Sequence, residues 1–429
     1  MRITVVGMGK IGLPLAVQFA RKGHSVIGTD INPETVRLVN AGREPFPNEA
    51  HLADYLQIEI ASGRLTATTE TSDAVQGADA VVVVVPLFVD DEARPDFTAM
   101  DAATRDVARG LQSGTLISYE TTLPVGTTRK RLVPLLEEGS RLVAGQEFFV
   151  VFSPERVLTG RVFADLRRYP KLVGGIDKES EERGIVFYRE VLDFDGRSDL
   201  PRPNGVWAMG SAEAAEMAKL AETTYRDVNI GLANQFALFG ERNGIDVTAV
   251  IDACNSQPYS HIHTPGIAVG GHCIPVYPRL YLWNDPEASI VRAAREANAL
   301  MPEQVVRRLE REIGSLSGLS VAVLGAAYRG GVKETAFSGV FDVVAALEGR
   351  GAQPQVHDPL YSDDELRGLG FDVYTQGQPT DVLILHSDHE EYRQWDVSDC
   401  PGIRVVIDGR GTLNPDKWGP DCTYLRIGA

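Results

Sequence analysis

The sequence predicts an α/β protein with two Rossmann-like doubly wound domains, joined by a central region that contains one long helix. Three observations support this fold class. Apolar strand patterns alternate with helical patterns near both ends of the chain, a glycine-rich turn follows the first strand, and a helical pattern without proline fills residues 211–243. At 429 residues the chain is also long for a single hydrophobic core. We expect domains at residues 1–198, 199–300 and 301–429.

Composition restricts the class of protein. With 43% apolar residues the chain can form packed cores, and no run reaches the roughly 20 apolar residues that span a bilayer. The net charge of −17 argues against non-specific binding to nucleic acid. The four cysteines lack the spacing of a metal site, and the chain leads directly into a strand pattern without a signal peptide. We therefore expect a cytoplasmic protein without a metal, a membrane or a nucleic-acid partner.

The first domain begins with the pattern of a dinucleotide-binding site. An apolar strand over residues 2–6 is followed by a G-x-G-x-x-G turn at residues 7–12, a helical pattern over residues 13–22, and a second strand that ends at Asp30. This context makes the turn a strong signal, because the glycines permit a tight turn, a close approach of pyrophosphate and tight packing of helix on strand. Asp30 should accept hydrogen bonds from a ribose, and no arginine follows it, so we expect NAD rather than NADP. The expected cofactor contacts are Gly7, Gly9, Lys10, Ile11, Gly12 and Asp30.

Further parallel strands are expected in the first domain at residues 80–85, 116–120, 148–152 and 171–175, with a helix at residues 99–111. Ligands of such folds lie outside the carboxyl ends of the strands. Two of these ends carry polar residues, Thr122 and Glu155. Glu155 could be a solvated loop carboxylate or a catalytic one, and Thr122 could be a turn residue or a site residue.

The central region contains a helix over residues 211–243, which Ser211 should cap and Gly244 should end. Lys219, Thr223 and Arg226 follow helical spacing and share one face. A lysine on a helix is usually a solvated surface residue, but the neighbours of Lys219 are apolar.

A glycine- and proline-rich loop at residues 270–278 contains one cysteine, Cys273. It could be a small buried hydrophobic residue or a nucleophile, because a thiolate attacks electrophilic carbon. In the last domain, strands are expected at residues 320–325, 355–358, 381–386 and 404–408, with helices at residues 289–314, interrupted by Pro302, and at residues 340–350.

Taken together, these segments resemble the nucleotide-sugar 6-dehydrogenases, the UDP-glucose/GDP-mannose dehydrogenase family. Residues 121–127 (TTLPVGT) are similar to the family's STVPVGT, and residues 270–278 (GGHCIPVYP) to GGHCIPVDP. Residues 153–158 (SPERVL) resemble SPERV-x-PG of the UDP-N-acetylmannosamine dehydrogenase branch. The resemblance follows the family's order over nearly the whole chain.

The resemblance implies that the C6 alcohol of a UDP-sugar is oxidised to the carboxylate and that NAD accepts the hydride of each oxidation. The sugar would be held on Cys273 as a thiohemiacetal and then as a thioester. Lys219 would stabilise negative charge on the oxygen of the reacting carbon. Glu155, together with Thr122, would position or activate the water that hydrolyses the thioester. The implied catalytic residues are Cys273, Lys219, Glu155, Thr122, Thr223 and Tyr277, and Thr122 is also an implied cofactor contact. The implied substrate contacts are Glu155, Arg156, Val157, Lys219, Thr223, Arg226, His263, Gly270, Tyr328 and Arg329. The resemblance also implies a homodimer formed through the long helix. Because no second G-x-G-x-x-G is present, the last domain is expected to bind the nucleotide-sugar.

The sequence departs from the family at positions that bear on chemistry and substrate fit. Thr223 stands in place of an asparagine and Tyr277 in place of an aspartate. The other departures are Leu87, Gln235, Ala268, Ala336 and Phe337. Two alternatives therefore remain: a divergent member that acts on another sugar nucleotide or stops at partial oxidation in a secondary pathway, and a non-catalytic nucleotide-sugar-binding protein.

Overall fold

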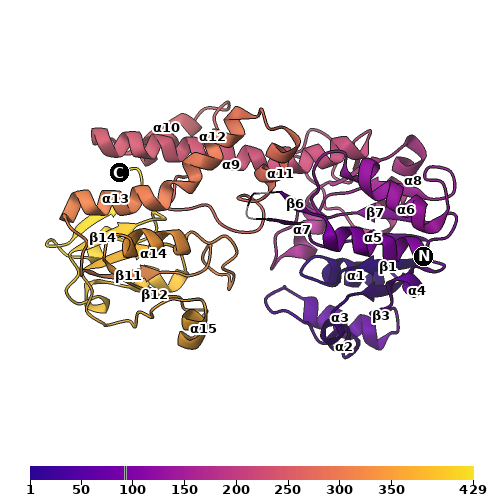
Figure 1. Ribbon diagram of the computed structural model, residues 1–429, viewed down its shortest axis with the longest axis horizontal. Helices are drawn as coiled ribbons and strands as arrows, with labels where there is room; N and C mark the ends of the chain where they lie inside the picture. Colours follow the sequence, from indigo (N-terminus) through magenta and orange to yellow (C-terminus); the bar gives the residue numbers. More distant parts are fainter. Residues whose placement is uncertain (91, 93) are drawn as a thin grey trace. The chain divides into compact units, whose positions relative to one another are not determined.

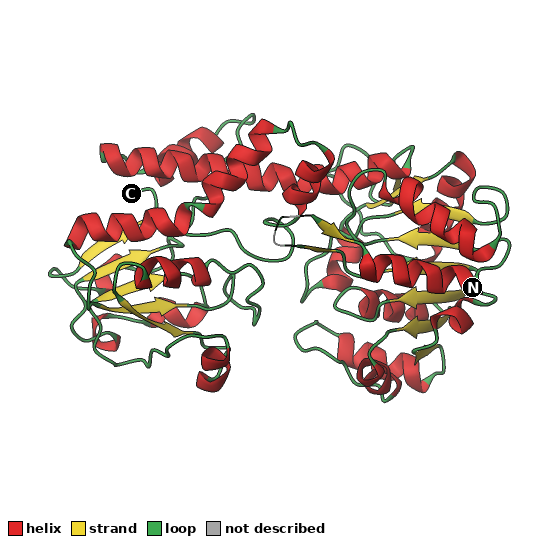
Figure 2. Cartoon of the chain, in the orientation of Figure 1, coloured by secondary structure: helices red, strands yellow, loops and turns green. Residues whose placement is uncertain are grey.

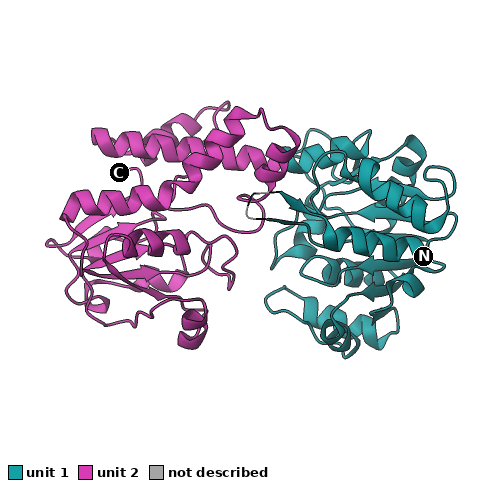
Figure 3. Ribbon diagram, in the orientation of Figure 1, with its two compact units in different colours: residues 1–221 teal, residues 222–429 magenta. Residues whose placement is uncertain are grey.

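The computed structural model describes residues 1–90, 92 and 94–429, which divide into two compact units, residues 1–221 and 222–429 (Figure 3). The division falls within one long helix, α9 (Ala212–Asn243), whose first part belongs to the first unit and whose remainder belongs to the second. Figures 1 and 2 show helices covering the strands in each unit. Ser211 caps α9 as predicted, since its Oγ accepts from the Ala214 N–H at 3.1 Å, and Gly244 ends it with a positive φ of 64°.

The described part of the first unit contains an eight-stranded sheet in the order β10-β9-β8-β7-β4-β1-β2-β3. Its strands are β1 (Arg2–Val6), β2 (Ser25–Thr29), β3 (Leu65–Thr68), β4 (Ala80–Val83), β7 (Leu116–Tyr119), β8 (Phe149–Phe152), β9 (Lys171–Gly175) and β10 (Val206–Ala208). Six neighbouring strands of this sheet are parallel, in the order β8-β7-β4-β1-β2-β3, and they reproduce the strand order of a dinucleotide-binding fold. A separate antiparallel pair is formed by β5 (Phe88–Val89) and β6 (Pro95–Asp96).

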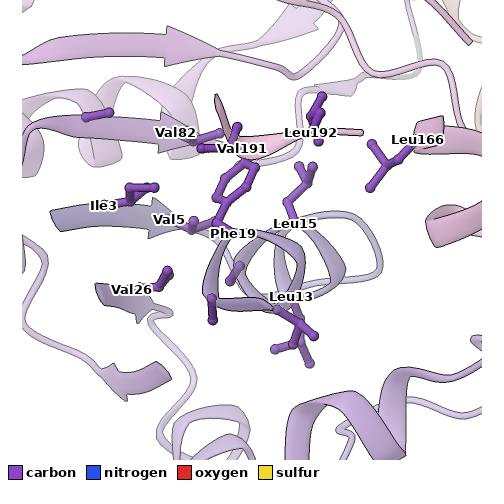
Figure 4. Packing of buried hydrophobic residues seen from close by; sticks show 14 of the residues in the cluster. Ile3, Val5, Leu13, Leu15, Phe19, Val26, Val82, Leu166, Val191 and Leu192 are labelled. Atoms are coloured by element: carbon purple, nitrogen blue, oxygen red, sulfur yellow. The ribbon is translucent and has the colours of Figure 1, made fainter. Parts of the chain in front are cut away.

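Helices cover the first sheet and complete its core. They are α1 (Gly12–Arg21), α2 (Pro33–Asn40), α3 (Leu52–Ala61), α4 (Thr71–Val75), α5 (Thr98–Gly110), α6 (Val133–Ser140), α7 (Val162–Arg168) and α8 (Lys178–Val191), with a π-helical turn at Thr128–Leu132. Figure 4 shows Phe19 of α1 packed among side chains of the sheet and of the segment that ends α8, including Val5, Val82 and Val191. All four side chains are fully buried, which accounts for the apolar pattern of these segments.

One strand runs against the direction predicted from the sequence. Residues 171–175 do form a strand, but β9 is antiparallel to β8, with Val151 opposite Gly175 and Phe152 opposite Gly174. The prediction of a parallel strand was wrong because a buried apolar run reads the same in either chain direction. As a consequence, the first residue of β9, Lys171, lies at the sheet edge where β7 and β8 end.

The second unit combines helices with a smaller sheet. After α9 come α10 (Val247–Asn255), α11 (Tyr277–Asn284), α12 (Ser289–Ala299) and α13 (Met301–Ile313), and the predicted break at Pro302 appears as the first turn of α13. The five-stranded sheet has the order β12-β11-β13-β14-β15 and is parallel throughout. Its strands are β11 (Ser320–Leu324), β12 (Gln353–His357), β13 (Val382–Leu385), β14 (Val405–Asp408) and β15 (Thr423–Arg426). The helices α14 (Val340–Glu348) and α15 (Asp363–Gly368) and short 3₁₀ turns at Glu390–Gln394, Val397–Asp399 and Pro415–Lys417 complete the unit. The strand order reverses between β11 and β13, where a doubly wound fold binds its ligand.

Candidate active site

The glycine turn after β1 has the geometry that each glycine predicts. Gly7 has a φ of 95°, and a Cβ at this position would lie 3.0 Å from the Val84 carbonyl oxygen. A Cβ at Gly12 would lie only 1.8 Å from the Gly7 carbonyl oxygen, so α1 can start there only with glycine. A Cβ at Gly9 would meet no atom within 4 Å, so nothing inside the protein requires glycine at this position. Gly9 therefore leaves room for an external group, as pyrophosphate binding requires.

Asp30 stands at the end of β2 and is held against the same turn. Its Oδ2 accepts from the Met8 N–H and its Oδ1 from the Asn32 N–H, both at 2.9 Å. Lys10 is exposed and Ile11 half-buried on the turn. A fixed carboxylate beside an open glycine turn fits the ribose and pyrophosphate of NAD.

A buried cluster of charges lies where β7 and β8 end. Lys171 Nζ donates to Glu120 Oε2 at 2.6 Å and to Glu155 Oε2 at 2.9 Å. Tyr188 of α8 donates to Glu120 Oε1 at 2.6 Å and also shares a hydrogen bond with Ser118 Oγ. Because Glu155 had been predicted and Glu120 and Lys171 had not, the structure adds two charged partners to the expected site residue.

The two carboxylates have opposite pKa shifts. Burial raises the pKa of Glu120 to about 7, although Lys171 acts in the opposite direction. Burial also acts upward on Glu155, but Lys171, the Arg156 N–H and Lys219 outweigh it and lower the pKa of Glu155. Lys219 is 7% exposed, so it is not a solvated surface lysine.

Thr122 lies in a buried loop that a glutamate holds in place. Thr122 is 6% exposed, and further along the loop Glu216 accepts from the Gly126 N–H at 2.5 Å and from the N–H and Oγ1 of Thr128 at 2.9 and 2.7 Å. Glu216 precedes Lys219 by one helical turn in α9. The loop and the lysine are thus positioned by the same part of one helix.

Arg156 and Val157 have contacts within the fold. The Arg156 N–H donates to Glu155 Oε1 at 2.7 Å, and its guanidinium donates to the Pro170 carbonyl at 2.8 Å. Val157 is half-buried against the apolar core. The structure therefore places both residues beside Glu155 and in contact with the surrounding fold.

In the second unit, Cys273 has an exposed thiol, whereas Cys400 is buried and Cys254 and Cys422 are half-buried. Its loop packs on Tyr328 and Phe337: a Cβ on Gly270 would lie 2.6 Å from Tyr328 Cβ, and the Gly271 N–H donates to the Ala336 carbonyl at 2.9 Å. The glycines are required by this close approach.

The second unit also contains the predicted site residues Tyr277, Thr223, Arg226 and His263. The Cys273 carbonyl accepts from the N–H of Tyr277, which begins α11, at 2.9 Å. Thr223 is buried, and Arg226 lies within 3.5 Å of Glu222. Burial, followed by the charge of Arg226, lowers the pKa of His263.

The predicted Tyr328 and Arg329 follow β11 at the reversal of strand order. Arg329 is exposed, and the Tyr328 carbonyl accepts from the guanidinium of the half-buried Arg410 at 3.1 Å. Asp358, at the end of β12, accepts from the Ala326 N–H at 2.8 Å. This turn is therefore held as the glycine turn of the first unit is, by an acid at the end of the neighbouring strand.

Two further observations, on metal ions and on membranes, concern the described residues as a whole. Among residues 1–90, 92 and 94–429, no three His, Cys, Asp or Glu side chains form a group that could hold a metal ion. None of the helices in this same part of the chain is long and apolar enough to cross a membrane.

A hollow of about 850 Å³, lined by Asp79, Ala80 and Leu116 among others, opens at the amino ends of β4 and β7. It lies opposite the edge where a doubly wound sheet binds its ligand.

Residues 1–192 match the NAD binding domain of the UDP-glucose/GDP-mannose dehydrogenase family, residues 213–300 its central domain and residues 322–415 its UDP binding domain. The chain is 34% identical to the UDP-N-acetyl-D-mannosamine dehydrogenase of Pyrococcus horikoshii over 98% of this chain and 97% of that protein. It is 33% identical to that of Campylobacter jejuni over 91% of this chain and 96% of that protein. A solved UDP-D-ManNAc dehydrogenase structure from Pyrococcus horikoshii matches with a TM-score of 0.87, 31% identity and coverage of 100% and 99%. A UDP-glucose dehydrogenase structure from Pyrobaculum islandicum matches with a TM-score of 0.86, 26% identity and coverage of 99% and 97%.

Proposed function

Because the chain belongs to the UDP-glucose/GDP-mannose dehydrogenase family and is an NAD-dependent oxidoreductase, we propose that it oxidises the C6 alcohol of a UDP-sugar to the carboxylate. A 2-acetamido sugar similar to UDP-N-acetylmannosamine is the proposed substrate. The names of the relatives and the SPERVL segment at residues 153–158 support this choice. The single observation that carries the proposal of a full oxidation is the exposed thiol of Cys273 in its glycine loop.

Bound NAD supplies the hydride acceptor for each oxidation. In the first oxidation the C6 alcohol loses a hydride and a proton and becomes an aldehyde. The Sγ of Cys273 then forms a bond to the aldehyde carbon, which gives a thiohemiacetal. Loss of a second hydride and proton gives a thioester, and water cleaves its C–S bond to release the acid and the free thiol.

The proposed roles of the other residues follow from their charge and burial. Lys219, a buried cation, stabilises negative charge on the reacting oxygen. Glu155, whose pKa is lowered, stays ionised and acts with Thr122 on the attacking water. Thr223 and Tyr277 are the proposed catalytic positions that differ from the family.

Substrate contacts are proposed for the remaining predicted residues, namely Arg156, Val157, Arg226, His263, Gly270, Tyr328 and Arg329. Tyr328 and Arg329 follow a strand at the reversal of strand order of the parallel sheet, which supports their assignment. A cytoplasmic homodimer is also proposed. Exposed apolar side chains on α9, including Leu232, Phe236 and Phe239, support that dimer.

Counting NADH per sugar consumed tests the proposal. UDP-N-acetylmannosamine, UDP-glucose and GDP-mannose are supplied in turn in limiting amounts, and two NADH per accepted sugar are expected. One NADH per sugar would establish the alternative of an enzyme that stops at the aldehyde. No NADH with any sugar would establish a binding protein and overturn the proposal.

Cys273→Ser tests the covalent step, because serine is a much weaker nucleophile than a thiol at neutral pH. The variant should form no acid yet bind NAD with wild-type affinity, measured by fluorescence titration. Cys254→Ser, a half-buried cysteine of α10, is the matched control and should keep acid formation. Acid production by Cys273→Ser at the wild-type rate would show that the cysteine has only a structural role.

A further inference from the structure

The cluster at the ends of β7 and β8 contains more acid than a simple ion pair needs. One cation, Lys171, is shared by two carboxylates, Glu120 and Glu155, which reach it from two neighbouring strand ends. Burying a second carboxylate without a second cation costs free energy, so an ion pair that only stabilised the fold would be better built with one acid. The second acid therefore calls for a functional explanation.

The three side chains form a line that leads inward. Glu155 is 11% exposed, Lys171 is 4% exposed, and Glu120 is completely enclosed. A cavity of about 10 Å³, lined by Glu155, Arg156 and Lys171 among others, adjoins the outer end and has the size of a single water. Glu155 thus stands at the side where a proton could enter, and Glu120 at the closed end.

We propose that Lys171 and Glu120 form a proton store behind Glu155, in which Glu120 takes up the proton that Glu155 accepts during the reaction. This inference rests on the proposed function, in which Glu155 acts on the water that cleaves the thioester and receives a proton from it. Lys171 and Glu120 are positioning residues in this scheme, because they act on the substrate only through Glu155.

The transfer balances without a further reactant. Nζ of Lys171 first gives one of its protons to Glu120 Oε2 along the 2.6 Å hydrogen bond, which leaves an amine with a free lone pair, and protonated Glu155 then donates its proton to that lone pair across the 2.9 Å contact. Lys171 remains an ammonium group, Glu155 returns to a carboxylate and Glu120 becomes a carboxylic acid. Tyr188 already donates to the other oxygen of Glu120, so Oε2 is the oxygen that takes the proton.

The electrostatics favour this direction. The charged or titratable groups that act on Glu120 are Lys171 from β9, Glu155 after β8 and Tyr188 from α8. Burial raises the pKa of Glu120 to about 7, whereas Lys171, the Arg156 N–H and Lys219 outweigh burial and lower the pKa of Glu155. Two acids whose surroundings separate their proton affinities in this way can divide the roles of proton acceptor and proton store.

Two variants of the full-length enzyme separate a proton store from a structural ion pair. Glu120→Gln keeps the shape of the side chain but cannot be protonated. Lys171→Arg keeps the charge and can bridge both carboxylates, but a guanidinium does not exchange its proton in this pH range. Glu59→Gln is the control, because Glu59 is also a buried acid of the first unit and pairs with Arg64 at 2.7 Å.

The pH profile of kcat is the main readout. We expect an inflection near pH 7 in the wild type and in Glu59→Gln, and its loss in both Glu120→Gln and Lys171→Arg. At pH 7.5 kcat should fall about tenfold in these two variants, less than the roughly 10²-fold expected for losing a general base itself. NAD affinity and the ratio of NADH to sugar should stay as in the wild type. An unchanged profile in Glu120→Gln, or full activity of Lys171→Arg, would overturn the proton store and leave the proposed function standing.

Infrared spectroscopy of the resting enzyme gives a second test that needs no substrate. The difference spectrum of the wild type minus Glu120→Gln should contain a protonated carboxyl band that titrates near pH 7, because Glu216, the other buried acid whose pKa is raised to about 7, contributes to both proteins and cancels. Absence of this band from the difference spectrum would overturn the inference whatever the activity. If the band is present but no sugar is oxidised, the proposed function fails and the store has no reaction to serve.

Discussion

Replacing Glu216 with glutamine should change how the stability of the protein depends on pH. Glu216 is completely buried, and its two carboxylate oxygens receive three hydrogen bonds from Gly126 and Thr128. Burial raises the pKa of Glu216 to about 7, although these hydrogen bonds act in the opposite direction. A glutamine keeps one acceptor oxygen for Thr128 but turns an NH₂ group towards the Gly126 N–H. Two donors would then face each other in the interior, which costs about 1–3 kcal/mol.

The sign of the pH effect follows from the direction of the pKa shift. The folded pKa is about 7 and the unfolded pKa is 4.5, so ionisation is penalised in the folded state. The contribution of Glu216 to stability is complete below pH 4.5 and is lost as the pH rises through 7. The loss amounts to about 3 kcal/mol in total, of which about 2 kcal/mol falls between pH 5.5 and 8.5. Glutamine does not titrate, so the variant lacks this loss.

Urea unfolding of the full chain at pH 5.5 and pH 8.5, followed by circular dichroism, measures both effects. Glu216→Gln should be less stable than the wild type at pH 5.5, and this difference should shrink by about 2 kcal/mol at pH 8.5. Glu34→Gln, an exposed acid of α2 whose pKa is lowered by Arg37, is the matched control and should show the same difference at both pH values. A difference for Glu216→Gln that stays constant or grows with pH would refute the reasoning, because the carboxylate would then be ionised throughout.

Three further predictions concern the cofactor turn and the chemistry. Gly12→Ala should lower the free energy of unfolding by about 1–3 kcal/mol or more, because its Cβ would lie 1.8 Å from a carbonyl oxygen of the turn. Gly9→Ala, whose Cβ would meet nothing within 4 Å, should unfold like the wild type yet bind NAD more weakly by calorimetry, and equal destabilisation by both changes would contradict the assigned roles. Asp30 should make kcat/KM for NAD exceed that for NADP by at least about tenfold, or 1.4 kcal/mol, and equal use of the two cofactors would argue against it. Finally, Tyr277 and Thr223, which replace the family's aspartate and asparagine, should weaken the activation of water, so a covalent sugar adduct on Cys273 should accumulate during turnover and be seen by mass spectrometry of acid-quenched enzyme. Tyr277→Asp combined with Thr223→Asn should shorten the lifetime of this adduct, and absence of any adduct in the wild type would contradict slow hydrolysis.

The elements that the sequence predicted correctly depend on neighbours a few residues apart. The strand, glycine turn and helix at the start of the chain are recognisable because each glycine must meet a local steric demand, as the 1.8 Å approach at Gly12 illustrates. The ends of α9 were also predictable, since Ser211 caps the helix by a local hydrogen bond and Gly244 adopts a positive φ.

Strands at the margins of the sheets were missed for a different reason. β3, β10 and β15 each form an edge of their sheet and keep most of their residues half-buried or exposed. They lack the continuous apolar run of a central strand, and only pairing with a neighbour defines them. Their existence is therefore a property of the assembled sheet.

The sequence by itself determined the strand–turn–helix unit for NAD, the long central helix and the glycine loop of Cys273, because each depends on the chemistry of adjacent residues. Only the tertiary structure decided the direction of β9. That direction brings Lys171 to the edge where β7 and β8 end and places it between Glu120 and Glu155. In the sequence these three charges are isolated residues with no common spacing. Their proton affinities are set by burial and by one another, and both of these arise only when the strands have packed.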